Sequence, residues 1–108
     1  MRLQATDDDD KRYEMRAEKI RQAIFEKSPE KLAEMAKDGD KEIRSRVAEN
    51  EMTSPDTLTL LASDSDGGVR KAVACNKNTP IEAMECLCND GDYFVSDYAV
   101  RMLGKRNQ

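Results

Sequence analysis

Three pairs of aspartates, with one residue between the members of each pair, are the most regular set of reactive side chains in this sequence. The pair recurs every 26 residues, as Asp38 with Asp40, Asp64 with Asp66, and Asp90 with Asp92. Neighbouring carboxylates can serve as general acid and base, and an aspartate directly before a helix can cap it. Catalytic groups are needed once, whereas a cap is needed in every repeat. The recurrence therefore favours capping.

A column of arginines accompanies the aspartates. Arg44 and Arg70 each follow the second aspartate of a pair by four residues, and Arg21 holds a similar place in the first helical segment. We interpret the column as a ladder of charge-assisted hydrogen bonds between stacked repeats. The alternative is a basic ridge for phosphates or an acidic partner, formed by Arg44, Arg46, Arg70, Lys71 and Arg101. Three acids, Glu42, Glu49 and Asp97, interrupt that ridge.

Two adjacent aromatic residues break the repeat. Tyr93 and Phe94 stand where the other repeats have Lys41-Glu42 and Gly67-Gly68. One interpretation is that the two rings, with Tyr98, Met102 and Leu103, fold over the open end of the array. The other is that Tyr93, Phe94 and Tyr98 form a partner-binding or dimerising patch, because aromatic side chains concentrate binding energy at interfaces.

Other catalytic chemistry has little support. The chain has no histidine, no glycine-rich phosphate loop, and no serine or cysteine beside an evident base. Cys86 and Cys88 point about 200° apart on a helix, so they cannot readily hold one metal ion, and Cys75 is the thiol expected to be exposed. We therefore predict no enzymatic activity, no metal and no cofactor.

The elements that position these side chains are pairs of short helices. Before each aspartate pair lies an apolar triplet with helical spacing, namely Leu32-Met35-Ala36, Leu58-Leu61-Ala62 and Met84-Leu87-Cys88. A second triplet follows each pair at Ile43-Arg46-Val47, Val69-Ala72-Val73 and Val95-Tyr98-Ala99. Each repeat therefore contains two helices around its aspartates.

Capping residues mark the helix ends. Hydroxyl-proline pairs predict the start of each first helix, at Ser28-Pro29, Ser54-Pro55 and Thr79-Pro80. Thr79 and Glu82 also match a capping box, and Asn50 and Asn76 predict left-handed helix ends. Gly67-Gly68 predicts a short second helix that is partly 3₁₀, with a close approach to its backbone as the alternative.

The domain boundaries follow from these patterns. Residues 1–9 are expected to form a flexible acidic tail, and residues 10–108 a single domain with a leading helix at 10–27 and repeats at 28–53, 54–78 and 79–105. The last repeat has Ser96 in place of Arg70 and Met102 in place of Asn76, as expected of a terminal capping repeat.

Composition limits the surroundings and the partners. The 108 residues suit one domain, and the net charge of -4 provides no general attraction to nucleic acid or anionic lipid. No apolar run approaches the roughly 20 residues of a membrane-spanning helix, and the start of the chain lacks the layout of a signal peptide. We predict a cytoplasmic protein that is not inserted in a membrane.

Residues Leu58 to Asp66, followed by Val69 to Asn76 and then Thr79-Pro80, resemble the bacterial leucine-rich repeat variant family, whose repeats are similar in style to HEAT repeats. The resemblance covers about residues 20–105. It implies a right-handed superhelix that offers an extended surface to a partner. Some members carry an iron-sulfur centre on an N-terminal cysteine cluster, but Cys75, Cys86 and Cys88 lie in the second half, so that cofactor is not expected here.

The expected fold is all-α, a short right-handed α-solenoid of paired short helices with about 26 residues per repeat. The expected function is a non-catalytic protein-interaction module or small adaptor that uses a helical-repeat surface. The alternative is a nucleic-acid-binding solenoid that uses the basic ridge. A protein partner is expected, and a second copy of this chain at the open C-terminal end is the alternative partner.

Overall fold

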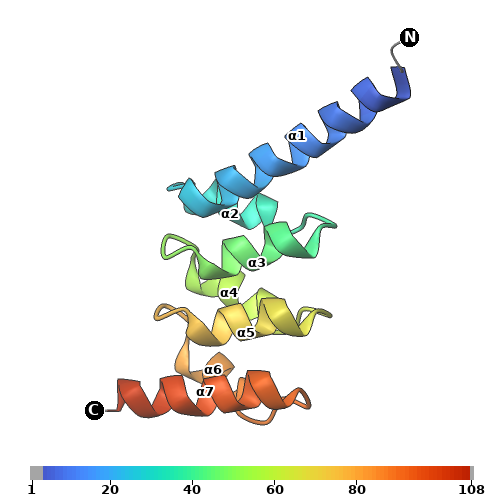
Figure 1. Cartoon of the computed structure of the whole chain (residues 1–108). Helices are drawn as coiled ribbons and strands as arrows, with labels where there is room; N and C mark the ends of the chain where they lie inside the picture. Colours follow the sequence, from blue (N-terminus) through green and yellow to red (C-terminus); the bar gives the residue numbers. More distant parts are fainter. Residues whose placement is uncertain (1–3, 108) are drawn as a thin grey trace.

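The computed structural model describes residues 4–107, and the side chains of residues 11–107. This part of the chain is all-helical and contains no strand. Its elements, labelled in Figure 1, are α1 (Gln4–Phe25), α2 (Pro29–Met35), α3 (Lys41–Glu49), α4 (Pro55–Leu61), α5 (Gly67–Cys75), α6 (Ile81–Leu87) and α7 (Tyr93–Arg106).

The helices lie in two layers. The odd-numbered helices are side by side in chain order, with α1 against α3, α3 against α5, and α5 against α7. Each even-numbered helix packs on the odd-numbered helix that follows it. The result is an elongated body with extents of 62 × 29 × 20 Å. Within the described residues, no helix is long and apolar enough to cross a membrane.

The core runs between the two layers and is built from the predicted apolar triplets. The even-numbered helices contribute one fully buried residue each, Leu32, Leu58 and Met84. The odd-numbered helices contribute buried pairs at matching places, which are Ile43 and Val47, Val69 and Val73, and Val95 and Ala99. Burial of these side chains supplies the main driving force for packing the layers together.

The aspartates cap the helices as predicted. The carboxylate of Asp40 accepts the backbone N–H of Glu42 at 2.9 Å, that of Asp66 accepts Val69 N–H, and that of Asp92 accepts Phe94 N–H. The first aspartate of each pair accepts the backbone N–H of the second, closing a tight loop before the helix. Both carboxylates of each pair are therefore occupied by local structure.

Two of the three predicted hydroxyl caps are confirmed, and the third is wrong. Ser28 and Ser54 accept backbone N–H groups at the starts of α2 and α4. Thr79 does not cap α6, which has Pro80 at its N-cap position and no side-chain cap, so the capping box is absent. Thr79 is buried and donates to Val73 O at 2.6 Å, as Thr53 donates to Val47 O. Thr79 therefore corresponds to Thr53, not to Ser54.

The two asparagines end their helices in a different way from the one predicted. Their φ values are -71° at Asn50 and -82° at Asn76, so neither is left-handed. Instead, the buried amide of Asn50 donates to Ala23 O at 2.9 Å, and that of Asn76 donates to Ala48 O at 2.8 Å and Asn50 O at 3.0 Å. These bonds join the end of each odd-numbered helix to the end of the previous one.

Two other boundaries differ from expectation. The structure starts α1 at Gln4 and ends it at Phe25, so most of the segment expected as a tail continues the leading helix, and residues 1–3 of that tail lie outside the described residues. The expected 3₁₀ character after Asp66 is wrong, because α5 is an α-helix of nine residues, the same length as α3.

The asparagine contacts lead to a test of stability. Replacing Asn76 with Asp keeps the shape but places a carboxylate against two carbonyl oxygens that now accept hydrogen bonds. We expect the free energy of unfolding to fall by at least about 2 kcal/mol, because buried groups lose their partners and a charge is added. Urea denaturation followed by circular dichroism measures this, with Asn89→Asp in the exposed turn after α6 as the matched control. Equal stability of the two variants would contradict the assigned role.

Candidate partner-binding surface

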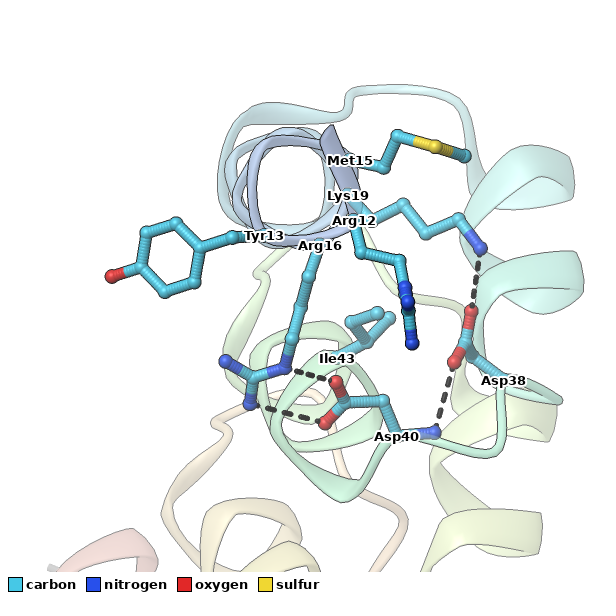
Figure 2. Close-up of a pocket in the computed structure, with 8 residues that line it drawn as sticks. All are labelled: Arg12, Tyr13, Met15, Arg16, Lys19, Asp38, Asp40 and Ile43. Atoms are coloured by element: carbon cyan, nitrogen blue, oxygen red, sulfur yellow. Dashed lines mark hydrogen bonds and ion pairs between the residues drawn. The ribbon is translucent and has the colours of Figure 1, made fainter. Parts of the chain in front are cut away.

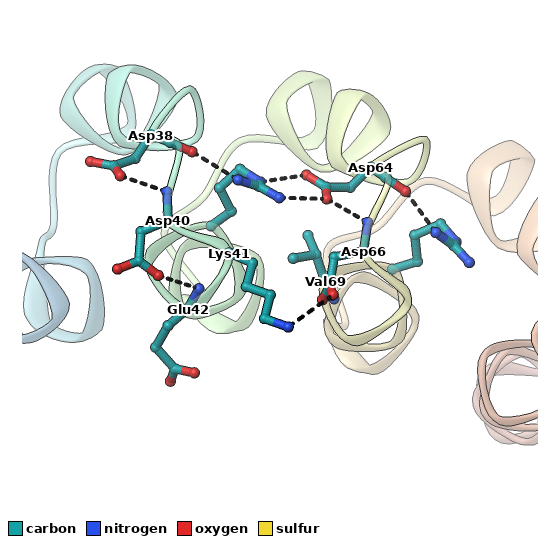
Figure 3. Close-up of polar contacts among 9 residues, drawn as sticks. Asp38, Asp40, Lys41, Glu42, Asp64, Asp66 and Val69 are labelled. Carbon is teal, nitrogen blue, oxygen red and sulfur yellow. Dashed lines mark hydrogen bonds and ion pairs between the residues drawn. The ribbon is translucent and has the colours of Figure 1, made fainter.

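Arginine side chains connect the loop before one odd-numbered helix to the loop before the next. Arg44 donates from Nε and Nη2 to the carboxylate of Asp64 at 2.8 and 3.0 Å, and from Nη1 to Asp38 O at 2.9 Å. Arg70 repeats the arrangement with the carboxylate of Asp90 and with Asp64 O. Figure 3 shows the loops of Asp38 with Asp40 and of Asp64 with Asp66, and dashed lines mark the polar contacts around them. The predicted ladder is thus confirmed for Arg44 and Arg70.

Partial burial of these ion pairs strengthens the attraction between their charges and also makes an unpaired charge costly. The side chains of Arg44 and Asp64 are 15% and 9% exposed. Burial works against ionisation of Asp64, but hydrogen bonds from Arg44 and from Asp66 N–H outweigh it and hold the pKa of Asp64 below its usual value. The hydrogen bond from Arg70 is the largest influence on Asp90 and lowers its pKa as well. All three guanidinium nitrogens of Arg44 and of Arg70 therefore already donate to the aspartate loops.

In the leading helix, α1, residues other than Arg21 contact the next aspartate loop, so the prediction for Arg21 is wrong. Arg21 pairs with Glu18 on its own helix. The first aspartate loop instead receives Lys19, whose Nζ lies 3.6 Å from Asp38, and Arg16, which pairs with Asp40. Neither residue was predicted, because α1 does not keep the 26-residue spacing of α3 and α5.

The remaining cations of the predicted ridge also have intramolecular partners. Arg46 pairs with Glu42 and Glu49, and Arg101 pairs with Asp97 at 3.1 Å. Lys71 lies over the ring of Tyr98, with Nζ 4.6 Å from the ring centroid. The five ridge cations are therefore spread over separate contacts and do not form a continuous basic strip.

The predicted aromatic residues separate into two groups. Tyr98, Met102 and Leu103 pack against the core as expected. Tyr93 and Phe94 do not fold over the end of the array, since they are 70% and 66% exposed. Their rings contact each other edge to face, with centroids 5.6 Å apart. Because both residues lie in the first turn of α7, their side chains extend from the loop end of the helix instead of lying over its apolar face.

A groove lies between α5 and α7 beside Phe94, and we call it the α7 groove. Its volume is about 680 Å³, and its lining includes Phe94, Tyr98, Met102, Lys71, Arg101 and Lys105. Two rings and a methionine provide apolar contact area, while the three cations and Asp97 provide polar contacts. Five of the eight residues predicted as a site therefore meet around one groove or its aromatic border, whereas Arg44, Arg46 and Arg70 lie elsewhere.

The glycines at the start of α5 allow aspartate carboxylates to come close to the backbone. At Gly67, an added Cβ would lie 2.7 Å from Oδ2 of Asp92, and at Gly68 it would lie 2.9 Å from Oδ2 of Asp66. The close approach at Gly67, which was the alternative interpretation, is the one observed. In the preceding repeat the equivalent position is Lys41, whose Nζ lies 3.8 Å from Asp66.

The last helix replaces the missing asparagine with an arginine. Arg106 donates to Thr79 O at 2.6 Å and to Asn76 O at 2.9 Å. Asn76 O is the counterpart of Asn50 O, which the Asn76 amide binds. The sequence pattern missed this residue because Arg106 lies four positions beyond Met102, where the spacing predicts the donor. Ser96, in the arginine column, donates only to Tyr93 O of its own helix.

The three cysteines are free thiols. Cys75 is exposed as predicted, Cys86 is exposed as well, and Cys88 is half-buried. Burial is the main cause that raises the pKa values of Cys75 and Cys88 above their usual range. Raised pKa values lower the thiolate fraction, so neither thiol is activated as a nucleophile.

Comparison with known proteins yields no relative, since no family model, no curated protein and no solved structure matches this chain. The resemblance to the leucine-rich repeat variant family stays a prediction from the residues that carry it. The function must therefore be argued from the surface of the chain itself.

The ladder gives a prediction for pH. Because the pKa values of Asp64 and Asp90 are lowered in the folded state, their contribution to stability is complete above the ordinary aspartate pKa of about 4 and is lost as the pH falls through the lowered values. We expect the urea midpoint to fall between pH 5 and pH 2. In the Asp64→Asn/Asp90→Asn variant that fall should be smaller, whereas the surface control Asp56→Asn should behave as the parent. An unchanged slope in the double variant would contradict the assignment.

The glycines give a second prediction. Gly104, in the last turn of α7, has open space at its Cβ position, so Gly104→Ala should raise the free energy of unfolding by about 0.5 to 1 kcal/mol. Gly67→Ala should give less than that or a loss, because the new methyl group displaces the Asp92 carboxylate from its capping position. Thermal denaturation of both variants measures the difference, and equal gains would contradict the close approach.

Proposed function

We propose that this chain is a short right-handed α-solenoid built on a 26-residue repeat and that it functions as a non-catalytic protein-interaction module. The architecture is supported by residues 26 apart in the sequence that make equivalent contacts. Arg44 and Arg70 make the same three kinds of hydrogen bond, and Asn50 and Asn76 both donate to carbonyl oxygens at the end of the preceding odd-numbered helix. Identical contacts at successive interfaces are what stacked repeats require.

The aromatic border of the α7 groove carries the functional part of the proposal. Exposed Tyr93 and Phe94 stand next to a concave surface lined by Tyr98 and Met102, which are only partly buried. Keeping two rings in water is unfavourable for an isolated domain, and aromatic side chains beside a groove are common anchors at interfaces. A segment of a partner protein that covers Phe94 would remove this exposed apolar surface from water.

Nucleic acid is the alternative ligand, favoured by the combination of Phe94 and Tyr98 with Lys71, Arg101 and Lys105 in one groove. Bases can stack on aromatic rings while cations contact phosphates. Against this, Arg44 and Arg70 are occupied by aspartates, and Arg101 is paired with Asp97. A protein partner is therefore the better supported ligand.

Photocrosslinking tests the proposal. Benzoylphenylalanine in place of Phe94, in the protein expressed in its native host, should give a discrete crosslinked protein on irradiation. Thr59, an exposed residue on α4, provides the control position and should not give that product. Competition with excess unlabelled protein should abolish the product, whereas the Phe94→Ser variant as competitor should be at least tenfold less effective.

Stability measurements separate binding from folding. Because Phe94 is mostly exposed, Phe94→Ser should change the free energy of unfolding by less than about 0.5 kcal/mol. A large loss of stability with no crosslinked product would show that the rings are structural. A labelled 20-nucleotide single strand that binds at 50 mM salt, with a steep loss of affinity at higher salt, would favour nucleic acid instead.

A further inference from the structure

Two hollows meet near the C-terminal ends of α5 and α7. The α7 groove is the larger one. Beside it lies a hollow of about 210 Å³, whose lining includes Cys75, Asn76, Lys77, Met102, Lys105 and Arg106. Met102 and Lys105 line both the groove and the hollow. The two therefore form one continuous surface, which we call the α5–α7 surface and define by the linings of both.

Three lysines of this surface have no carboxylate partner within the part of the chain that the structure describes. Lys77 and Lys105 are exposed and form no ion pair with the described residues. Lys71 lies over the ring of Tyr98, and this contact does not neutralise its charge. Arg106 is not counted with them, because it donates to two backbone carbonyls. The positive charge of the three lysines is therefore available to a ligand.

Carboxylates beside these lysines are held by arginines. Asp97 lines the α7 groove, but it pairs with Arg101 of its own helix at 3.1 Å. Glu49 lies close enough to Cys75 to raise the pKa of that thiol, but it pairs with Arg46. Because both acids already have a cation, neither of them neutralises the lysines.

The groove beside α1 shows the opposite arrangement. Figure 2 shows Arg16 reaching to Asp40 and Lys19 reaching to Asp38, above the buried side chain of Ile43. Both cations there already have carboxylate partners within the chain. Charge therefore favours the α5–α7 surface over the groove beside α1 as the place for an acidic ligand.

The apolar and the basic parts of the α5–α7 surface lie at different ends of α7. Phe94, in the first turn, is 66% exposed, whereas Lys105 lies in the last turn, next to the hollow that Lys77 lines. The two α7 residues are 11 positions apart, which along an α-helix is about 16 Å. An extended peptide covers this distance with about five residues.

We infer that the α5–α7 surface binds an acidic segment of a partner protein, with one bulky apolar side chain on Phe94 and, about five residues away, carboxylates on Lys77 and Lys105. This inference rests on the proposed function and gives its partner a chemical class. Nucleic acid is less favoured, because Asp92 borders Phe94 and would repel a phosphate backbone at that end. The net charge of -4 disfavours acidic ligands elsewhere on the chain, so the attraction is confined to this surface.

A peptide titration tests the inference. The probe is a fluorescein-labelled peptide of 12 residues, with one phenylalanine and three glutamates that begin five positions after it. One matched peptide carries glutamines in place of the glutamates, and the other carries serine in place of the phenylalanine. Fluorescence anisotropy at 50 mM salt should show saturable binding of the probe, and each matched peptide should bind at least tenfold more weakly.

Charge reversal of the two exposed lysines identifies the basic part of the site. Lys77→Glu/Lys105→Glu should weaken binding of the probe at least tenfold. Lys27→Glu/Lys31→Glu is the matched control, because it changes the net charge equally at two other exposed lysines, and it should alter binding less than threefold. Circular dichroism of both variants checks that they are folded.

The cysteines provide a measurement on the unmodified sequence, which does not depend on the folding of a variant. Cys75 lines the hollow, whereas Cys86 is an exposed thiol on α6. Saturating probe should slow alkylation of Cys75 by iodoacetamide at least threefold and leave alkylation of Cys86 unchanged, as measured by mass spectrometry of the two peptides. Equal protection of both thiols, or protection of neither, would contradict the assigned position.

The remaining outcomes overturn the inference. It fails if the probe does not bind up to 1 mM, if the glutamine peptide binds equally well, or if folded Lys77→Glu/Lys105→Glu binds normally. When one of these results occurs while benzoylphenylalanine at Phe94 still gives a crosslinked protein, the proposed function stands and the acidic ligand is wrong. A 20-nucleotide single strand that binds more tightly than the probe, and loses its affinity in the same lysine variant, would assign the surface to nucleic acid instead.

Discussion

The bidentate contact of Arg44 with Asp64 is the interaction on which the arrangement of the helices most depends. One guanidinium binds a carbonyl in its own aspartate loop and the carboxylate of the next loop, so it fixes the distance and orientation between the two. A partly buried ion pair adds little net stability compared with apolar packing, but removing one partner is costly because the other charge is left unpaired. Its main effect here is to fix the register between the two loops, since the planar guanidinium donates its hydrogen bonds in one geometry only.

A second row of polar contacts lies at the opposite ends of the odd-numbered helices. The amides of Asn50 and Asn76 satisfy carbonyls that helix ends leave without partners, and Thr53 and Thr79 do the same within their own helices. Helices α3 and α5 each have an arginine contact at one end and an asparagine contact at the other, so both of their ends are fixed to neighbouring segments. The α7 groove occurs where this regular scheme changes, since α7 begins with two aromatic residues.

Sequence patterns predicted the features that depend on residues close in the chain. Apolar spacing predicted the helices, and the aspartates before them predicted the caps, because both signals are local. The role of Thr79 was predicted wrongly because a hydroxyl residue before a proline is a general signal for a helix cap. The Thr79 hydroxyl instead donates to Val73 O, a contact that this signal does not reveal. The role of the asparagines was missed for a related reason, since their partners lie 24 to 28 residues away. The exposure of Phe94 depends on how α7 is placed against its neighbours, which no local pattern encodes.

The two kinds of contact also point in opposite directions along the chain. Arg70 reaches forward to the following loop, while Asn76 reaches back to the preceding helix end. The segment from Ser54 to Thr79 therefore donates forward through Arg70 and backward through Asn76. It also accepts from both neighbours, from Arg44 at the Asp64 carboxylate and from Arg106 at Thr79 O. A duplicated copy of this segment would find complementary groups on each side without any further substitution. On the proposed repeat architecture, a chain that is longer or shorter by whole units would keep the same contacts at every border between units.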